Sequence, residues 1–170
     1  MSVSANPLVP KDGSIVITDA TGTPKSLTIL YEDGDLQVQG LMSGQMRKQE
    51  YKTRGVPYSV REVERMSIPF TFTCHATGII GDGTDALPGD ALLKLGVWAS
   101  AVSKASAALG GAYLLQLAWT GERSNFGATA DSSITLKYCS FEVDFAEGDP
   151  SKLSIKGTAH ALSTDYLTIA

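Results

Sequence analysis

Four residues of this 170-residue chain are of the types that bind transition metals: Cys74, His75, Cys139 and His160. Zinc sites use such residues at short, regular spacings, but the chain has no C-x2-C or H-x3-H pair. Cys74 and His75 are adjacent in a strand-like run, so their side chains should point to opposite faces. We therefore expect no metal and no cofactor, and two free buried thiols. A disulfide would require the two cysteine-bearing strands to be neighbours.

Paired carboxylates and glycine-rich loops are the other features that could support chemistry. Glu62 and Glu64 share one face of a strand-like run, as a general acid–base pair would, but a solvated strand face explains them better. Segment 78–83 is glycine-rich yet lacks the Gly-Lys-Ser/Thr ending of a phosphate loop. The aspartates of 82–90 do not have EF-hand spacing, and no G-x-S-x-G motif is present. The sequence predicts a protein that is not an enzyme.

The size and net charge of the chain further limit the class of protein it can belong to. A chain of 17.9 kDa is expected to form one domain, 1–170. A domain of this size buries roughly 70% of its unfolded surface, so it needs no disulfide or structural metal for stability. Its net charge of −4 argues against a nucleic-acid-binding surface. Segment 1–4 has neither the basic nor the apolar part of a signal peptide, and the apolar stretch 97–119 is interrupted by Lys104 and two glycines. We expect a soluble cytoplasmic product, or one that is secreted by assembly rather than by a signal.

Period-two alternation dominates the chain and is typical of half-buried strands. One stretch, 89–103, instead places apolar residues at helical spacing after a proline, which predicts a single α-helix. The fold class expected is a mainly antiparallel β-sandwich or barrel with this one helix. The predicted strands cover 15–17, 27–31, 36–40, 58–65, 68–76, 112–120, 133–145 and 153–161.

The last long hairpin, 141–161, has the clearest pattern. Its two alternating runs flank the turn residues 147–151, so one face should be dry and the other wet. In the strand before this turn, the apolar phase slips by one residue between Tyr138 and Cys139. This slip predicts a β-bulge or a sharp bend at that point.

Segment 41–57 shows neither periodicity, so a long loop is predicted there, and a long loop in a compact domain often has a function. The terminal segments 1–13 and 162–170 are expected to be an extended arm and a short tail. A basic, methionine-containing loop on an acidic protein could dock onto an acidic partner, including a copy of itself, or its charges could simply be solvated. The loop residues proposed for contacts are Met42, Met46, Arg47, Lys48, Lys52 and Arg54.

Several short motifs follow one another along the chain in an order and spacing that can be compared with known families. They are the acidic turn Tyr31-Glu32-Asp33-Gly34, the loop 51–55, the strand 68–76, the Leu-rich helical stretch, and the strand 134–145 followed by Glu147-Gly148-Asp149-Pro150. In this order and spacing the chain resembles the major tail (tail tube) proteins of long-tailed bacteriophages. These belong to a superfamily that includes type VI secretion tube proteins.

The resemblance implies a β-sandwich with one helix, of which six copies close into a ring by joining their sheets. Rings would stack into a hollow virion tail tube, assembled in the bacterial host cytoplasm, around a tape-measure protein and beside tail tip and terminator proteins. DNA would pass through the tube without specific binding. An acidic protein is suited to this role, because it carries the same sign of charge as DNA. It also implies that segment 41–57 makes inter-ring contacts. The residues expected to line the lumen are Asp35, Gln37, Gln39, Glu62 and Glu64.

Two alternatives stay open at this point. One is a type VI secretion-like tube protein, and the other is a non-assembling carbohydrate-binding β-sandwich. A carbohydrate-binding module would need exposed aromatic side chains on a concave face. Trp98, Trp119 and Tyr138 instead occupy apolar-patterned positions typical of a core.

Overall fold

The computed structural model describes residues 13–29, 36–41, 46–76, 81, 87–121 and 130–170. The predicted N-terminal arm, except Gly13, lies outside these residues, as do Asp35, Met42 and the acidic turn 31–34. The described strands are β1 (Gly13–Thr18), β2 (Ser26–Ile29), β3 (Gln37–Val38), β4 (Met46–Thr53), β5 (Val56–Arg65), β6 (Ile68–His75), β7 (Leu115–Gly121), β8 (Ser132–Ala146), β9 (Lys152–Ala159) and β10 (Leu167–Ile169).

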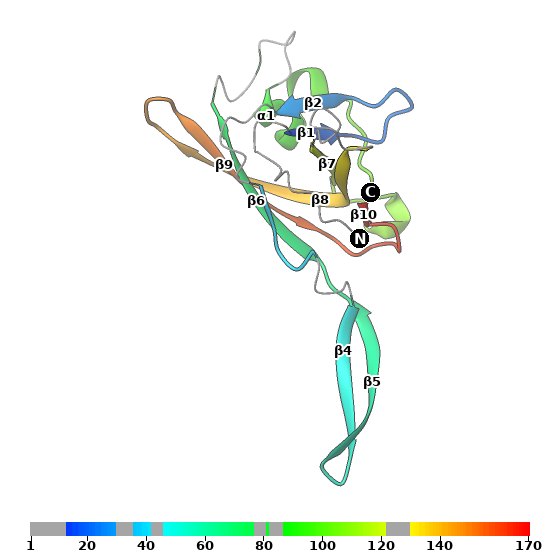
Figure 1. The fold of residues 1–170 in the computed structure, drawn as a ribbon. Helices are drawn as coiled ribbons and strands as arrows, with labels where there is room; N and C mark the ends of the chain where they lie inside the picture. The colour runs from blue at the N-terminus through cyan, green and yellow to red at the C-terminus, as the bar shows by residue number, and fades with distance from the viewer. Residues whose placement is uncertain (1–12, 30–35, 42–45, 77–80, 82–86, 122–129) are drawn as a thin grey trace.

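All described pairings are antiparallel, which confirms the predicted fold class. The main sheet runs β2-β1-β7-β8-β9-β6-β3, with β10 also on β8, and curls over its own inner face (Figure 1). As described, this path is open rather than closed into a barrel. The inner face is sandwich-like and carries the core. Core side chains include Ile15, Ile17, Phe70, Phe72, Leu115, Leu117, Leu136, Leu153, Ile155 and Tyr166.

The phase slip in β8 is a bulge, as predicted. Opposite β7, Leu136 pairs with Leu117 and Cys139 pairs with Leu115, so β8 holds one residue more than its partner. Tyr138 takes a positive φ of 56° at this bulge. The extra residue lets both Leu136 and Cys139 point into the core. Beyond it, β8 continues into the predicted hairpin with β9.

The predicted helix over 89–103 is wrong in length. The helix α1 spans only Pro88–Leu93 and ends at Lys94, which is left-handed with φ 58°. Gly96 follows with φ 48°, and a Cβ there would lie 2.9 Å from Asp90 Oδ1, so the chain turns where a helix would continue. The next buried side chain, Trp98, comes from a 3-10 turn, η2 (Gly96–Trp98); a second, η3 (Ala107–Leu109), follows. No helix among the described residues is long and apolar enough to span a membrane.

The predicted long loop over 41–57 is also wrong, because most of it forms the β4–β5 hairpin. Its turn is Arg54-Gly55, and both residues have positive φ, 49° and 82°. Such two-residue turns match the right-handed twist of a hairpin. The pattern offered no periodicity because neither face of this hairpin is buried, and periodicity records burial.

Candidate functional site

The β4–β5 hairpin is an arm that extends away from the body of the molecule (Figure 1). Among the described strands, β4 and β5 pair only with each other. A two-stranded ribbon alone is marginally stable in water, because it lacks a third strand or a packed layer to cover it. The arm therefore has the form of a structure that needs a partner.

The root of the arm is fixed to the body. Only Met66 and Ser67 separate β5 from the core strand β6. The buried Tyr166 donates a hydrogen bond from its hydroxyl to the Met66 carbonyl at 2.6 Å. This contact holds the point where the arm leaves the sheet.

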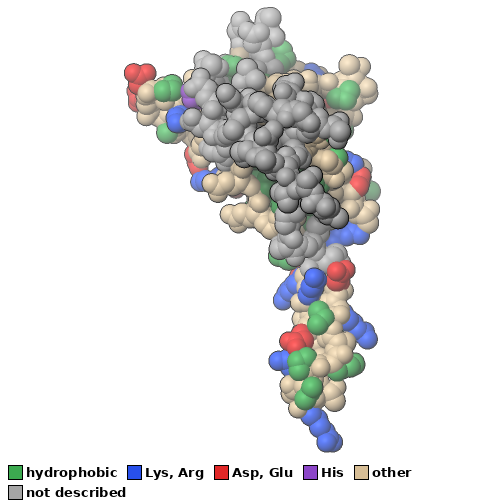
Figure 2. All heavy atoms as spheres, in the orientation of Figure 1, with side chains coloured by type: hydrophobic (Ala, Val, Ile, Leu, Met, Phe, Trp, Pro, Cys, Tyr) green, Lys and Arg blue, Asp and Glu red, His purple; other side chains and the backbone are tan. Residues whose placement is uncertain are grey.

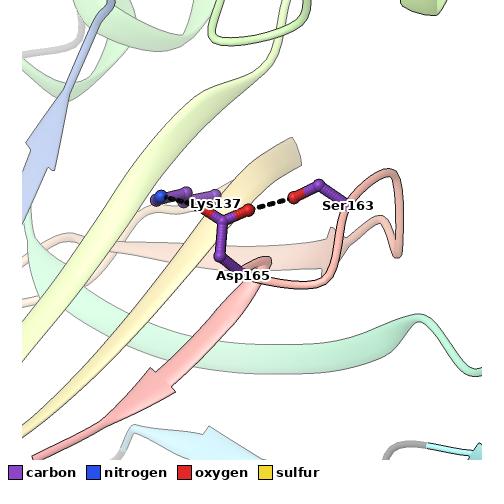
Figure 3. A network of polar contacts seen from close by, with 3 residues as sticks. All are labelled: Lys137, Ser163 and Asp165. Carbon is purple, nitrogen blue, oxygen red and sulfur yellow. Dashed lines mark hydrogen bonds and ion pairs between the residues drawn. The ribbon is translucent and has the colours of Figure 1, made fainter.

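The segment that carries Tyr166 is itself anchored by a polar network (Figure 3). Lys137 and Ser163 both donate to the Asp165 carboxylate, and the Lys137 amide donates to the Tyr166 carbonyl at 2.8 Å. The hydrogen bond from Lys137, followed by that from Ser163, lowers the pKa of Asp165 to about 2. The network thus fixes the crossover between β9 and β10 beside the root.

Strand β5 exposes a row of large apolar side chains to water. Tyr58 is 67% exposed and Val60 is 63% exposed, although both residue types favour half-buried sheet positions. Figure 2 shows hydrophobic and basic side chains together along the arm. The exposed apolar residues of the arm and its root are Tyr51, Val56, Tyr58, Val60, Val63 and Met66. Their concentration on one element marks an interaction surface.

The arm also gathers predicted site residues that the sequence had assigned to two different surfaces. Arg47 pairs with Glu64 at 2.9 Å, and Lys48 lies opposite Glu62 in the register. The Arg47–Glu64 pair is largely exposed and is worth only about 0–1 kcal/mol.

The remaining predicted contact residues also belong to the arm. Lys52 lies 3.9 Å from Glu50, and Arg54 occupies the turn. Met46 begins β4, and its side chain is outside the described part.

A second surface is the polar outer face of β3, β6, β9 and β8. Cross-strand pairing places Gln37, Thr71, Lys156 and Glu142 in one row across these four strands. Lys156 donates to Asp144 at 2.7 Å, and this hydrogen bond raises the pKa of the lysine. The one ammonium in this row is thus paired with a carboxylate, and the other side chains of the row are amide, hydroxyl and carboxylate groups.

This polar face is slightly hollow. A depression of about 270 Å³ lies over the strands. Gln39, another predicted lumen residue, follows β3, and its amide donates to the Pro69 carbonyl at 3.0 Å. The alternation in the sequence predicted that the last hairpin has a solvent-exposed polar face. It did not predict which other strands contribute to the same face. The depression is lined by Pro69, Phe70, Thr71, Ser140, Glu142, Lys156, Gly157 and Thr158.

The cysteines sit apart from both surfaces. Cys74 and Cys139 are buried and are not joined in a disulfide, and they lie on β6 and β8, which are separated by β9. Burial raises the pKa of the Cys139 thiol to about 12, so the thiolate is disfavoured. Among the described residues, no group of three or more His, Cys, Asp or Glu side chains could hold a metal ion.

Comparison with known proteins defines the fold. No family model matches the sequence, and no curated protein matches it. A chain of the solved PVC sheath/tube terminator, from an extracellular contractile injection system in its extended state, matches with TM-score 0.57 and 10% identity, covering 99% of each chain. A chain of the anti-feeding prophage cap, which terminates the AFP tube, matches with TM-score 0.52 and 12% identity over 100% of this chain and 95% of that one. At these identities the likeness concerns the fold.

Proposed function

We propose that this protein is a structural, non-enzymatic subunit of a phage-tail-like tube, in which copies of the chain join into a ring. The observation that carries the proposal is the β4–β5 arm, whose apolar side chains are exposed and whose strands pair only with each other among those described. A permanent place in an assembly gives such an arm the cover that the monomer lacks.

The polar face of β3, β6, β9 and β8 suits the inner wall of such a ring. This wall is made mainly of hydroxyl, amide and carboxylate groups. Its two lysines on β9 are Lys156, which is paired with Asp144, and Lys152, so the wall offers DNA no large cluster of cations to bind. We place Gln37 and Gln39 on this wall, with Glu142 and Asp144. Glu62 and Glu64 lie on the arm, and their assignment to the lumen, like that of Asp35, stays a prediction.

The finer assignment follows the sequence resemblance. Six copies would form each ring of the tail tube of a long-tailed bacteriophage, around a tape-measure protein and in contact with tail tip or terminator proteins. The particle would be a virion assembled in the host cytoplasm. Arg47, Lys48, Lys52 and Arg54, with Met42 and Met46, would contact neighbouring subunits from the arm and the segment before it.

A second candidate is a ring that ends the tube rather than extends it. It is favoured because the two matched solved structures are of a tube terminator and a tube-terminating cap. A terminator would form single rings that do not stack, whereas a tube subunit would form stacks of rings.

Negative-stain electron microscopy of the concentrated purified protein, beside sedimentation velocity, tests the proposal. Hollow tubes would support the tube subunit, and isolated rings would support the terminator. Particles that stay monomeric at every concentration, together with binding in a glycan screen, would replace the proposal with the carbohydrate-binding module.

A further inference from the structure

The β4–β5 arm and the rest of the chain carry opposite charge. Six of the 14 basic residues but only three of the 18 acidic residues fall in 46–65, so the arm carries +3 while the remainder carries −7. A basic arm that leaves an acidic body is electrostatically complementary to the body of another copy.

The β8–β9 hairpin offers a matching surface on that body. From Glu142 to Asp149 the chain has four carboxylates and no basic residue. Within the described structure, Glu147 and Asp149 make no ion pair, and both are exposed. Beside them Phe145 is 53% exposed, although its strand-mates Phe141 and Val143 pack against the core. The turn therefore combines an uncovered aromatic ring with unpaired acid groups.

The β4–β5 arm and the β8–β9 turn of one molecule do not contact each other, so their charged and apolar groups cannot pair within that molecule. Figure 1 shows the β8–β9 turn projecting from the body in a different direction from the β4–β5 arm. A contact between two different patches of identical chains is head-to-tail, and such a contact closes into a ring when the rotation permits.

We propose that the β4–β5 arm of one subunit docks on the β8–β9 hairpin end of the next copy of this chain. Phe145 packs against the apolar row of β5, Tyr58 and Val60 among it. Glu147 and Asp149 pair with basic groups of the arm, of which Lys48, Lys52 and Arg54 are the candidates. This inference rests on the proposed ring function and names the partner surface of the arm.

Charge reversal on each side separately gives a decisive test. The arm variant is Lys48→Glu/Lys52→Glu/Arg54→Glu, and the turn variant is Glu147→Lys/Asp149→Lys. Each alone should fail to assemble, because like charges face each other in every contact. An equimolar mixture should regain assembly, since an acidic arm then meets a basic turn and the wild-type arm meets the wild-type turn in alternation.

Sedimentation velocity of the two variants and their mixture supplies the readout, with circular dichroism to confirm folding. Lys94→Glu is the control for charge reversal outside both hairpins. It removes only a local contact of the lysine with the Tyr113 ring, so it should assemble as wild type does. If the wild type assembles but the mixture stays monomeric, or either variant assembles alone, the proposed contact is wrong while the ring function stands. If the wild type itself never assembles, both fail.

Discussion

The ring of Phe70 lies over Gly157, its cross-strand neighbour on β9. A Cβ on this glycine would come within 2.3 Å of Phe70 Cζ and 2.7 Å of the Ser140 carbonyl oxygen. Phe141, on the other side of Gly157, meets Phe70 edge-on with ring centroids 5.5 Å apart. The missing side chain thus makes room for an aromatic pair under the polar face of β6, β9 and β8.

The first prediction follows from this contact. Gly157→Ala should destabilise the fold by about 1–3 kcal/mol, because the methyl group must displace a buried ring or the backbone. Urea unfolding followed by fluorescence measures the loss. Gly22→Ala is the matched control, since a Cβ there has no atom within 4 Å, and it should leave stability within about 0.5 kcal/mol. Equal stability of the two variants would contradict the packing argument.

The second prediction concerns Asp19, a fully buried carboxylate that ties the β1–β2 turn to the segment after η2. Its Oδ1 accepts from Thr21 and Lys25, and its Oδ2 accepts from the Val102 amide at 3.1 Å. Asp19→Ala should cost roughly 1.5–3 kcal/mol, because these donors lose a charged acceptor. Asp19→Asn keeps one acceptor oxygen and should cost less. The thermal unfolding temperature should be lowest for Asp19→Ala, intermediate for Asp19→Asn and highest for the wild type. The reverse order would contradict a stabilising role of these hydrogen bonds.

The third prediction is a pH dependence from two carboxylates. Burial acts to raise the pKa of Asp19, but the hydrogen bonds from Thr21, Val102 and Lys25 lower it overall, and the pKa of Asp165 is lowered to about 2. Groups with depressed folded pKa values stabilise the fold above their unfolded value of 3.8, and this stabilisation is lost as pH falls towards 2. The urea midpoint should therefore drop between pH 4 and pH 2.

Substitution separates the contribution of Asp165 from the rest. Asp165→Asn should flatten part of that drop, because the variant has no carboxylate to protonate at this position. Asp149→Asn, at a carboxylate without an ion pair in the described structure, should follow the wild-type curve. An unchanged pH profile in Asp165→Asn would show that the Lys137–Asp165 contact does not stabilise the fold in solution.

The fourth prediction isolates the apolar row of the arm. Val60→Thr/Val63→Thr preserves side-chain shape but replaces one methyl of each valine by a hydroxyl group. It should weaken assembly, while leaving the stability of the body within about 0.5 kcal/mol. Val102→Thr changes an exposed valine outside the arm (49% exposed) and should assemble normally. Sedimentation velocity and thermal unfolding measure the two properties separately. Normal assembly of the double variant would remove β5 from the interface.

The body of the fold could be predicted from the sequence because burial leaves a pattern there. Ile68, Phe70, Phe72 and Cys74 alternate in the sequence and are all buried in β6. The phase slip at Tyr138 marked the bulge, since the inner face must be recovered after an inserted residue.

The arm could not be predicted from the same signal. Its strands have no buried face, so their side chains follow no apolar–polar alternation. The remaining signal was local: the Arg54-Gly55 turn, followed by a run that contains the β-branched and aromatic residues Val56, Tyr58 and Val60. The helix over 89–103 was predicted too long although a pattern was present there. Apolar residues at helical spacing also suit a short helix followed by a 3-10 turn, so the spacing alone does not give the length.

The central claim is that copies of this chain join through the β4–β5 arm. The most direct test is sedimentation velocity of the wild-type protein over a concentration series, beside a variant in which residues 47–64 are replaced by a short Gly-Ser linker. The account predicts a wild-type species near six times the 17.9 kDa subunit mass, or larger, and a folded monomer for the variant. A wild type that stays monomeric at every concentration, or a variant that assembles equally well, would contradict it.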